Sequence, residues 1–454
     1  MTRTRGLLRH GAAWMADLRD GSGLRAQAVR GGIGILALKI VNRVLSLAVA
    51  VLLARQLGPE RYGVYAYALA LVALISAPVK LGLPTLLVRE IATYQLRGQR
   101  QYLRGAIRRA NQAVAGLSLS LGAALAGATW LMSDRVGPDR VSTLVWAAVL
   151  VPIGALGSLR GAALRGLRRV VEGELPEKAL VPGLLVAFVV VAATAGVSLG
   201  PASAMALHVA SACIAFLIGA WLLQRALPEG TRQAAWVFED RRWLASVVPL
   251  TLIVTLRMVQ QQTDVLMLGL LAGAEDVGIY RVVLTGSQLV AFAYEALSTA
   301  LGPHAARLHA ANDTPRLQRL VTWNTRAMFA VGLPVGVMLI VAGGPILAVV
   351  FGGDFRRGHA ALAILCTAQL VNVGTGSASL LLNMAGHERV TARSLMWSAA
   401  ANVILNALLI PAFGIVGAAM ATAATMIGWN LALWRQVRNR LHVDPSVLHR
   451  LRAR

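Results

Sequence analysis

Residues 58–65 read Gly-Pro-Glu-Arg-Tyr-Gly-Val-Tyr, and residues 273–280 read Gly-Ala-Glu-Asp-Val-Gly-Ile-Tyr. Glycine, glutamate, glycine and tyrosine recur in the same order at a constant offset of 215 residues. A weaker match at this offset places Ala204-Met205-Ala206 on residues 419–421. Each of the first two stretches joins one long apolar run to the next, so the sequence predicts an internal repeat in which both copies contain the same helix-to-helix turn.

Apolar runs dominate the rest of the chain. The sequence is 57% hydrophobic and 14% charged, with a mean hydropathy of +0.63, whereas a soluble domain carries about a quarter charged residues. A spanning helix needs about 20 mostly apolar residues. We therefore predict an all-α polytopic membrane protein with twelve transmembrane helices, at residues 33–54, 63–83, 112–132, 143–159, 179–197, 203–223, 244–271, 278–301, 321–351, 360–385, 394–411 and 416–434.

The charges between these runs are distributed unevenly. The chain has 44 Lys and Arg against 20 Asp and Glu, a net charge of +24. With both termini cytoplasmic, 32 of the basic residues fall in inner segments and only six in outer loops, while the acids divide as 12 and six. This asymmetry follows the positive-inside rule. It accounts for most of the net charge, and it excludes the nucleic-acid binder that a pI near 11.6 would suggest for a soluble chain.

The repeat also predicts the domain organisation. Each half contains six crossings, an even number, so both halves enter the membrane from the same face and the repeat is parallel. Secondary transporters with such repeats rock one bundle against the other. The predicted parts are a basic cytoplasmic leader (1–32), an N-terminal six-helix bundle (33–223), a cytoplasmic linker (224–243), a C-terminal six-helix bundle (244–434) and a basic cytoplasmic tail (435–454).

Eight ionisable residues fall inside the apolar runs, where a lipid-facing charge costs about 2.5–3.5 kcal/mol at mid-bilayer. Arg281 and Arg326 lie near helix ends, where snorkelling to the interface is favoured over a role in a site. Polar stripes with helical spacing surround most of the others, so we predict a central cationic cavity for an anionic, phosphate-bearing cargo. The candidate ligands of a pyrophosphate or anionic glycan are Lys39, Arg43, Lys80, Arg257 and Arg281.

Asp264 and Glu295 are the two carboxylates within the predicted spans, and they are candidates for carrying a coupling proton. The alternative is that both are counter-ions of neighbouring arginines, such as Arg257 for Asp264. Cys213 and Cys366 have no metal-ligand spacing, and the sequence has no phosphate-binding loop, so we expect no cofactor and no enzyme activity. The basic leader and inner loops are partly amphipathic, which is typical of helices lying on anionic lipid headgroups.

Several stretches, taken in order, resemble the oligosaccharide (O-antigen type) flippases of the multidrug/oligosaccharidyl-lipid/polysaccharide exporter superfamily. The first is Leu-Ala-Arg-Gln-Leu-Gly-Pro-Glu-Arg-Tyr-Gly-Val-Tyr at 53–65. The others include Val-Arg-Glu-Ile-Ala at 88–92, Leu-Pro-Glu at 175–177, Asp-Val-Leu-Met-Leu-Gly at 264–269 and Asn-Val-Ile-Leu-Asn at 402–406. The resemblance spans about residues 30–435.

This resemblance implies a flippase that moves a polyprenyl-pyrophosphate-linked oligosaccharide across the bacterial inner membrane by alternating access, for surface polysaccharide or lipopolysaccharide synthesis. It implies as partners the lipid-linked glycan, membrane lipids, a polysaccharide polymerase and glycosyltransferases. A drug/cation antiporter of the same superfamily is the alternative, although a cationic lumen would repel its cargo. A membrane-bound glycosyltransferase ranks last, because the longest predicted outer loop has only about ten residues.

Overall fold

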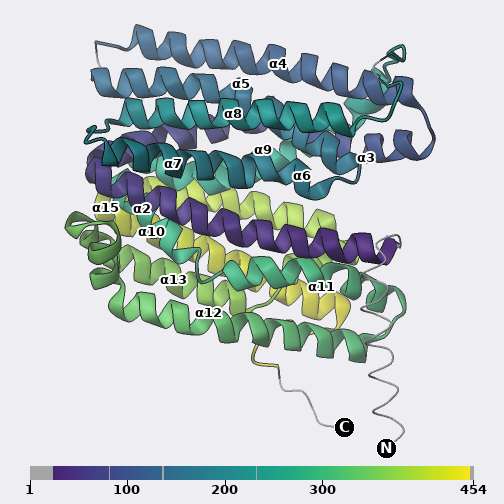
Figure 1. Ribbon diagram of the computed structural model, residues 1–454. Helices are drawn as coiled ribbons and strands as arrows, with labels where there is room; N and C mark the ends of the chain where they lie inside the picture. Colours follow the sequence, from purple (N-terminus) through teal and green to yellow (C-terminus); the bar gives the residue numbers. More distant parts are fainter. Residues whose placement is uncertain (1–23, 81, 135–136, 232, 450–454) are drawn as a thin grey trace, which may run out of the picture.

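The computed structural model describes residues 24–80, 82–134, 137–231 and 233–449, and these contain helices and no strand (Figure 1). The all-helical class predicted from the apolar runs is therefore confirmed for the described residues. The elements are α2 (Leu24–Val79), α3 (Leu83–Leu96), α4 (Arg100–Leu131), α5 (Pro138–Gly166), α6 (Val170–Leu175), the π-helix η1 (Pro176–Leu180), α7 (Val181–Thr194), α8 (Pro201–Ala226), α9 (Asp240–Leu271), α10 (Ala274–Ser287), α11 (Phe292–Ala310), α12 (Thr314–Phe351), the 3₁₀ helix η2 (Gly353–Gly358), α13 (His359–Gly374), α14 (Ala378–Met384) and α15 (Glu388–Leu441).

Two of these elements each consist of two helices that meet at a glycine kink. Gly58 interrupts α2 with φ 69°, and Gly414 interrupts α15 with φ 53°. Glycine tolerates this left-handed conformation because it has no Cβ. Figure 1 shows that the chain reverses direction at both kinks, so the two parts of each element run antiparallel. We call the end of the bundle that contains Gly58 and Gly414 the kink end, and the opposite end, where α2 begins and α15 ends, the terminal end.

The helices are long and apolar enough for a membrane. Among the described residues, eight helices pass a test of length and hydropathy, or nine if α10 and the start of α11 form one span bent by 51°. Seven of the predicted apolar runs each lie within one helix: 33–54, 143–159, 203–223, 244–271, 321–351, 394–411 and 416–434. The other five extend past a helix end or across a break between two helices: 63–83, 112–132, 179–197, 278–301 and 360–385. The number of twelve spans and the division into two repeats stay predictions.

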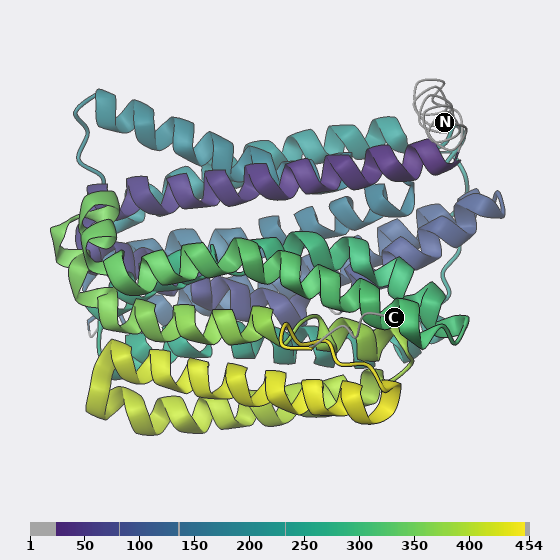
Figure 2. The ribbon, with the colours of Figure 1, turned by 90° about the horizontal axis from the view of Figure 1, so that it is seen from below.

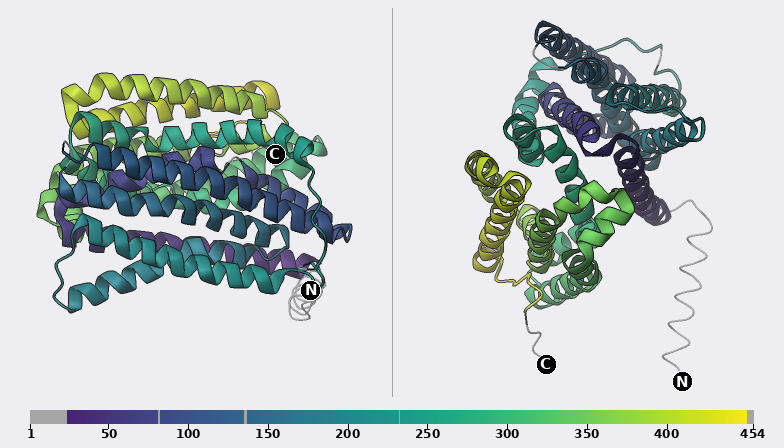
Figure 3. Two further views of the ribbon diagram at one scale, coloured as in Figure 1. Left: turned by 90° about the horizontal axis from the view of Figure 1, so that it is seen from above. Right: turned by 90° about the vertical axis from the view of Figure 1, so that its left-hand side faces the viewer.

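The helices form two groups with a shared boundary. Figures 2 and 3 show that α4, α5, α7 and α8 gather on one side and α11, α12, α13 and α15 on the other, with the long helices roughly parallel. Between the groups, α2 packs extensively against α10 and α9. The central cavity described below lies along this boundary.

The two repeated stretches pack against each other at the kink end. A Cβ added at Gly63 would lie 1.7 Å from the carbonyl oxygen of Ala274, and one added at Gly278 would lie 2.0 Å from that of Pro59. Two hydrogen bonds from Arg55 to the carbonyls of residues 349 and 350 join α2 to α12 nearby. The glycines shared by the two copies therefore allow a backbone-to-backbone contact that no other residue would permit.

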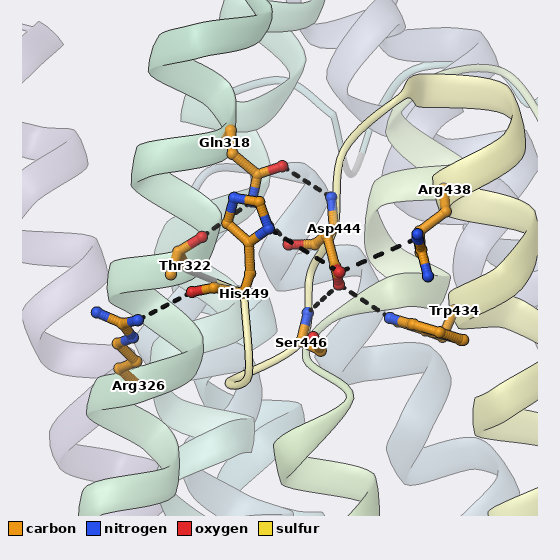
Figure 4. Close-up of polar contacts among 8 residues, drawn as sticks. All are labelled: Gln318, Thr322, Arg326, Trp434, Arg438, Asp444, Ser446 and His449. Carbon is orange, nitrogen blue, oxygen red and sulfur yellow. Dashed lines mark hydrogen bonds and ion pairs between the residues drawn. The ribbon is translucent and has the colours of Figure 1, made fainter. Parts of the chain in front are cut away.

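At the terminal end, the segment after α15 folds back onto α12 (Figure 4). The Gln318 side chain both donates to the Asp444 carbonyl and accepts from the Asp444 amide, at 2.7 Å each. The Asp444 carboxylate accepts from Trp434 Nε1 at 2.9 Å and from the Ser446 amide at 3.0 Å. Arg326 donates to the His449 carbonyl at 2.9 Å, which also ties this segment to α12.

The predicted segment borders agree only in part with the helices. The leader residues 1–23 and the last residues, 450–454, lie outside the described residues. Helix α2 already begins at Leu24, so the predicted border at residue 32 falls inside it. The predicted inner loop 160–178 is mostly helical, because α5 continues to Gly166 and α6 leads through η1 directly into α7.

Candidate functional site

A cavity of about 460 Å³ lies between α2, α7, α8 and α10. Both parts of α2 contribute to it, from residues 42–50 before the kink and 62–69 after it. The lining residues are Asn42, Arg43, Ser46, Leu47, Val49, Ala50, Tyr62, Tyr65, Ala66, Leu69, Glu177, Val181, Pro182, Leu185, His208, Arg281, Thr285, Gln288 and Leu289. Its volume is within the usual range for small-ligand sites.

Arg43 crosses from α2 to the other helix group. Its guanidinium donates to Gln288 Oε1 at 2.9 Å and pairs with the Glu295 carboxylate at 3.1 Å. It also lies over the Phe292 ring, 5.9 Å from the centroid. Lys39, one turn earlier on α2, donates to the Glu295 carbonyl at 3.3 Å. The structure thus brings together three residues that the sequence singled out, Lys39, Arg43 and Glu295, at the boundary between the two groups.

This ion pair is only partly shielded from solvent. The Arg43 side chain is 20% exposed and that of Glu295 is 52% exposed. An ion pair with such exposure contributes about 0–1 kcal/mol to stability.

Aromatic groups and a second arginine also line the cavity. Tyr65 and His208 are joined by a hydrogen bond of 2.7 Å between the phenol oxygen and Nδ1, and Tyr62 stacks beside Tyr65 at a centroid distance of 6.2 Å. Arg281, from α10, is close enough to both phenols to interact with them electrostatically. Arginine and phenol groups on one wall give an anionic ligand both charge and hydrogen-bond donors.

The cavity is less positive than the sequence analysis predicted. Of the five candidate cationic ligands, Arg43 and Arg281 line it. Glu177 also lines it, and Lys80, which does not line the cavity, interacts electrostatically with Glu177. Two arginines and one glutamate give the lining a formal charge of +1. Glu177 was missed because it falls in the predicted inner segment 160–178, outside the apolar runs.

Asp264 lies away from the cavity, in a buried polar cluster between α9, α10 and α15. Its side chain accepts hydrogen bonds from Tyr280 at 3.0 Å, from Asn406 at 3.0 Å and from Thr422. Asp264 is 4% exposed, and all three donors are neutral. Within the described residues, the Oδ1 atoms of Asn402 and Asn406 are buried without a hydrogen-bond partner. The cluster therefore combines one carboxylate with two amide oxygens of the kind that coordinate hard cations.

Arg257 does not pair with Asp264. It is an exposed residue of α9, and it makes no hydrogen bond or ion pair within the described part of the chain. The counter-ion alternative for Asp264 is therefore wrong for this arrangement, whereas Glu295 does act as a counter-ion, for Arg43. The partners of Asp264 come from helices 16, 142 and 158 residues away in the sequence, which its local pattern could not reveal.

Comparison with known proteins agrees with this architecture. The profile of a family described as "Polysaccharide biosynthesis protein" matches residues 52–357, about two thirds of the chain. A stretch of 163 residues is 28% identical to the "Probable low-salt glycan biosynthesis flippase Agl15" of Haloferax volcanii. Another, of 194 residues, is 27% identical to the "Probable flippase AglR" of the same organism. The matches cover 35% and 42% of this chain, and only 34% and 40% of these relatives.

Solved structures with the same fold cover nearly the whole chain. An inward-facing multidrug resistance MATE family transporter of the MOP superfamily superposes with a TM-score of 0.72 at 14% identity, over 90% of this chain and 98% of that one. The lipid II flippase MurJ, in an inward closed conformation, gives 0.69 at 13% identity, over 89% and 87%. The chain is thus a multi-pass membrane protein with the MOP transporter fold, and it belongs to the polysaccharide biosynthesis protein family.

Proposed function

We propose that this protein is a flippase for a polyprenyl-pyrophosphate-linked oligosaccharide, moving it from the inner to the outer leaflet of a bacterial inner membrane. In this proposal both termini are cytoplasmic, so that the terminal end faces the cytoplasm and the kink end faces outward. The observation that carries the proposal is the cavity between α2 and α10, with Arg43 and Arg281 in its walls. Arginine binds phosphate oxygens in a bidentate manner, as a pyrophosphate requires.

Cargo binding proceeds by exchange of partners on Arg43. In the structure the Glu295 carboxylate holds the guanidinium at 3.1 Å. A pyrophosphate carries more charge than one carboxylate, so it displaces Glu295 and is then held between Arg43 and Arg281. The released Glu295 no longer ties α2 to α11. Rocking of the residue 33–223 bundle against the 244–434 bundle then exposes the cavity to the other leaflet.

Asp264 supplies the coupling in this proposal. Its carboxylate is buried among neutral donors, so it needs a proton or a small cation to balance its charge. The two unpartnered amide oxygens of Asn402 and Asn406 favour a cation such as Na⁺. Because the cluster joins α9, α10 and α15, its occupancy would alter how these helices pack. Glu295 is a second candidate, since its protonation would release Arg43.

The proposal is tested by transport in liposomes. Purified protein is reconstituted with a fluorescent undecaprenyl-pyrophosphate disaccharide, and translocation is followed by chemical quenching of the outer leaflet. We expect Arg43→Ala and Arg281→Ala each to lower the rate at least tenfold, while Arg319→Ala, which removes an exposed arginine outside the cavity, leaves it unchanged. Wild-type rates in both cavity variants would refute the binding role.

Two further arms separate the alternatives. Imposed H⁺ and Na⁺ gradients are applied one at a time, and Asp264→Asn is expected to abolish the response to whichever gradient accelerates wild-type transport. Indifference of the wild type to both gradients would remove Asp264 from the mechanism. Efflux of a cationic dye in place of glycolipid transport would instead establish the drug/cation antiporter, for which Glu177 would be the cargo-binding carboxylate.

A further inference from the structure

A second cavity, with no residue in common with the central one, opens at the terminal end beside α4. It has a volume of about 440 Å³ and is formed by α4, the end of α8 and the linker that follows α8. Its lining consists of Arg104, Ile107, Arg108, Gln224, Leu227 and Thr231. The two arginines and two further polar side chains distinguish it from a gap between apolar helices.

The positive charge of this cavity comes from a short stretch of sequence. Residues 97–109 contain five arginines and no acidic residue. Arg100, Arg104 and Arg108 recur every fourth residue at the start of α4, so they lie on one face of the helix. Such a face attracts anions, and like charges this close together repel one another unless an anion lies between them.

The linker holds these arginines in place. Two of them stack on the Trp236 ring. The guanidinium of Arg108 lies 3.7 Å from the ring centroid, and that of Arg104 lies 5.0 Å from it. Arg104 also donates to the Ala234 carbonyl. The linker approaches α4 closely because residue 105 is glycine: a Cβ there would lie 2.0 Å from the Val237 carbonyl oxygen. Stacking fixes the plane of a guanidinium while leaving its edge able to bind an oxyanion.

Thr231 gives an independent indication of a ligand. It is 1% exposed and lines the cavity. Within the described residues its hydroxyl has no hydrogen-bond partner. A buried hydroxyl without a partner costs about 1–3 kcal/mol, and an oxygen-rich ligand in the cavity would supply the missing bond.

The level of the cavity along the bundle indicates the source of that ligand. Trp221 and Trp236 beside it are 49% and 44% exposed, and Arg225 stacks on Trp221 at 3.8 Å. Exposed tryptophans with arginines are typical of the membrane–water interface, where lipid headgroups lie. We propose that this cavity binds the phosphodiester headgroup of an anionic membrane lipid, with Arg108, Arg104 and Thr231 as its ligands.

The proposal is tested by titrating the purified full-length protein with phosphatidylglycerol and, separately, with phosphatidylcholine, and counting bound lipids by native mass spectrometry. We expect tighter binding of phosphatidylglycerol. Arg108→Gln should weaken it about tenfold, the effect of one lost charge-assisted hydrogen bond. Arg108 is exposed and stacks on Trp236 at the surface, so this variant retains the fold. The matched control Arg319→Gln removes an exposed arginine at the same end of the bundle and should bind as the wild type does.

Two more measurements make the result decisive. Thr231→Val removes the hydroxyl and keeps the shape of the side chain. Because this hydroxyl has no hydrogen-bond partner within the described residues, the change should leave the fold intact, and it should also weaken phosphatidylglycerol binding. Inorganic phosphate alone, added in competition, should displace little lipid. Unchanged phosphatidylglycerol binding in both Arg108→Gln and Thr231→Val would overturn the site, and displacement by inorganic phosphate at the concentration of the lipid would overturn its assignment to a lipid. Neither result bears on transport through the central cavity.

Discussion

Replacing Gly278 with alanine should push apart the two helices that close the kink end. The added Cβ would lie 2.0 Å from the Pro59 carbonyl oxygen and 3.0 Å from the Gly63 amide nitrogen. Ordinary van der Waals contact begins at 3.4 Å. Both neighbours are backbone atoms of α2, so no side chain can rotate to make room. The helices must therefore separate by about 1.4 Å at this contact.

The energy of this clash sets the expected effect. Inserting a methyl group into a well-packed contact costs about 1–3 kcal/mol. A conformation in which the kink end is open, with α2 and α10 apart, would not bear this cost. If the protein alternates between this open form and the closed form of the structure, Gly278→Ala shifts the equilibrium towards the open form by about 5- to 150-fold.

Distance measurements between the two helix groups report on this equilibrium. Nitroxide labels on Asp139→Cys and Asp354→Cys, two exposed positions at the kink end, are measured by pulsed electron spin resonance with Cys213 and Cys366 replaced by alanine. Gly278→Ala should increase the population of the longer distance. Gly127→Ala adds the same methyl group to α4, where nothing lies within 4 Å, and should change nothing. Identical distance distributions for wild type and Gly278→Ala would refute the reasoning.

Three other predictions concern polar contacts. Burial alone would raise the pKa of Asp444, but the hydrogen bonds to its carboxylate and a nearby arginine lower the pKa below its usual value. The ionised carboxylate therefore stabilises the fold above about pH 4, and this stabilisation is lost as the pH falls further. Thermal melts should show Asp444→Asn to be less stable by about 1–2 kcal/mol near neutral pH and less sensitive to acid, and identical melting curves would contradict this. Glu295→Gln should change stability by less than about 1 kcal/mol, because its pair with Arg43 is exposed, and it should bind inorganic pyrophosphate several-fold more tightly in calorimetry; unchanged affinity would argue against partner exchange. Tyr65→Phe should cost about 1 kcal/mol in thermal unfolding by removing the bond to His208, and a wild-type melting temperature would disprove this.

The long helices could be predicted from the sequence because most of them are long and apolar enough to span a membrane. Apolar runs separated by short polar segments leave few alternatives to α-helices in a bilayer. The repeated glycines were also informative, since a matched glycine at 63 and 278 indicates a position where a side chain is not tolerated. That these two glycines contact each other was not predictable, because it depends on how the helix groups face one another.

The site was predicted less completely, for a related physical reason. Arg43 and Glu295 were each identified as membrane-embedded charges, but their pairing joins residues 252 positions apart. Glu177 was assigned to an inner loop because the next predicted apolar run begins only at residue 179, yet the chain continues through a π-helix without a break. The Asp264 cluster depends on hydrogen bonds from Tyr280, Asn406 and Thr422. These residues lie in apolar helices with no local pattern that indicates a site, and only the packing of the helices brings them to the carboxylate.

The two halves of the chain contribute very unequally to the lining of the central cavity. Fifteen of its nineteen lining residues precede the 224–243 linker, and the other four come from α10 and the two residues that follow it. If the second half moves away, a cargo bound there would keep most of its contacts, because these are made by the first half. The first half would then determine which cargo the protein recognises. A chimaera that joins residues 1–223 of this chain to the second half of a relative should accept the cargo of this protein and not that of the other parent.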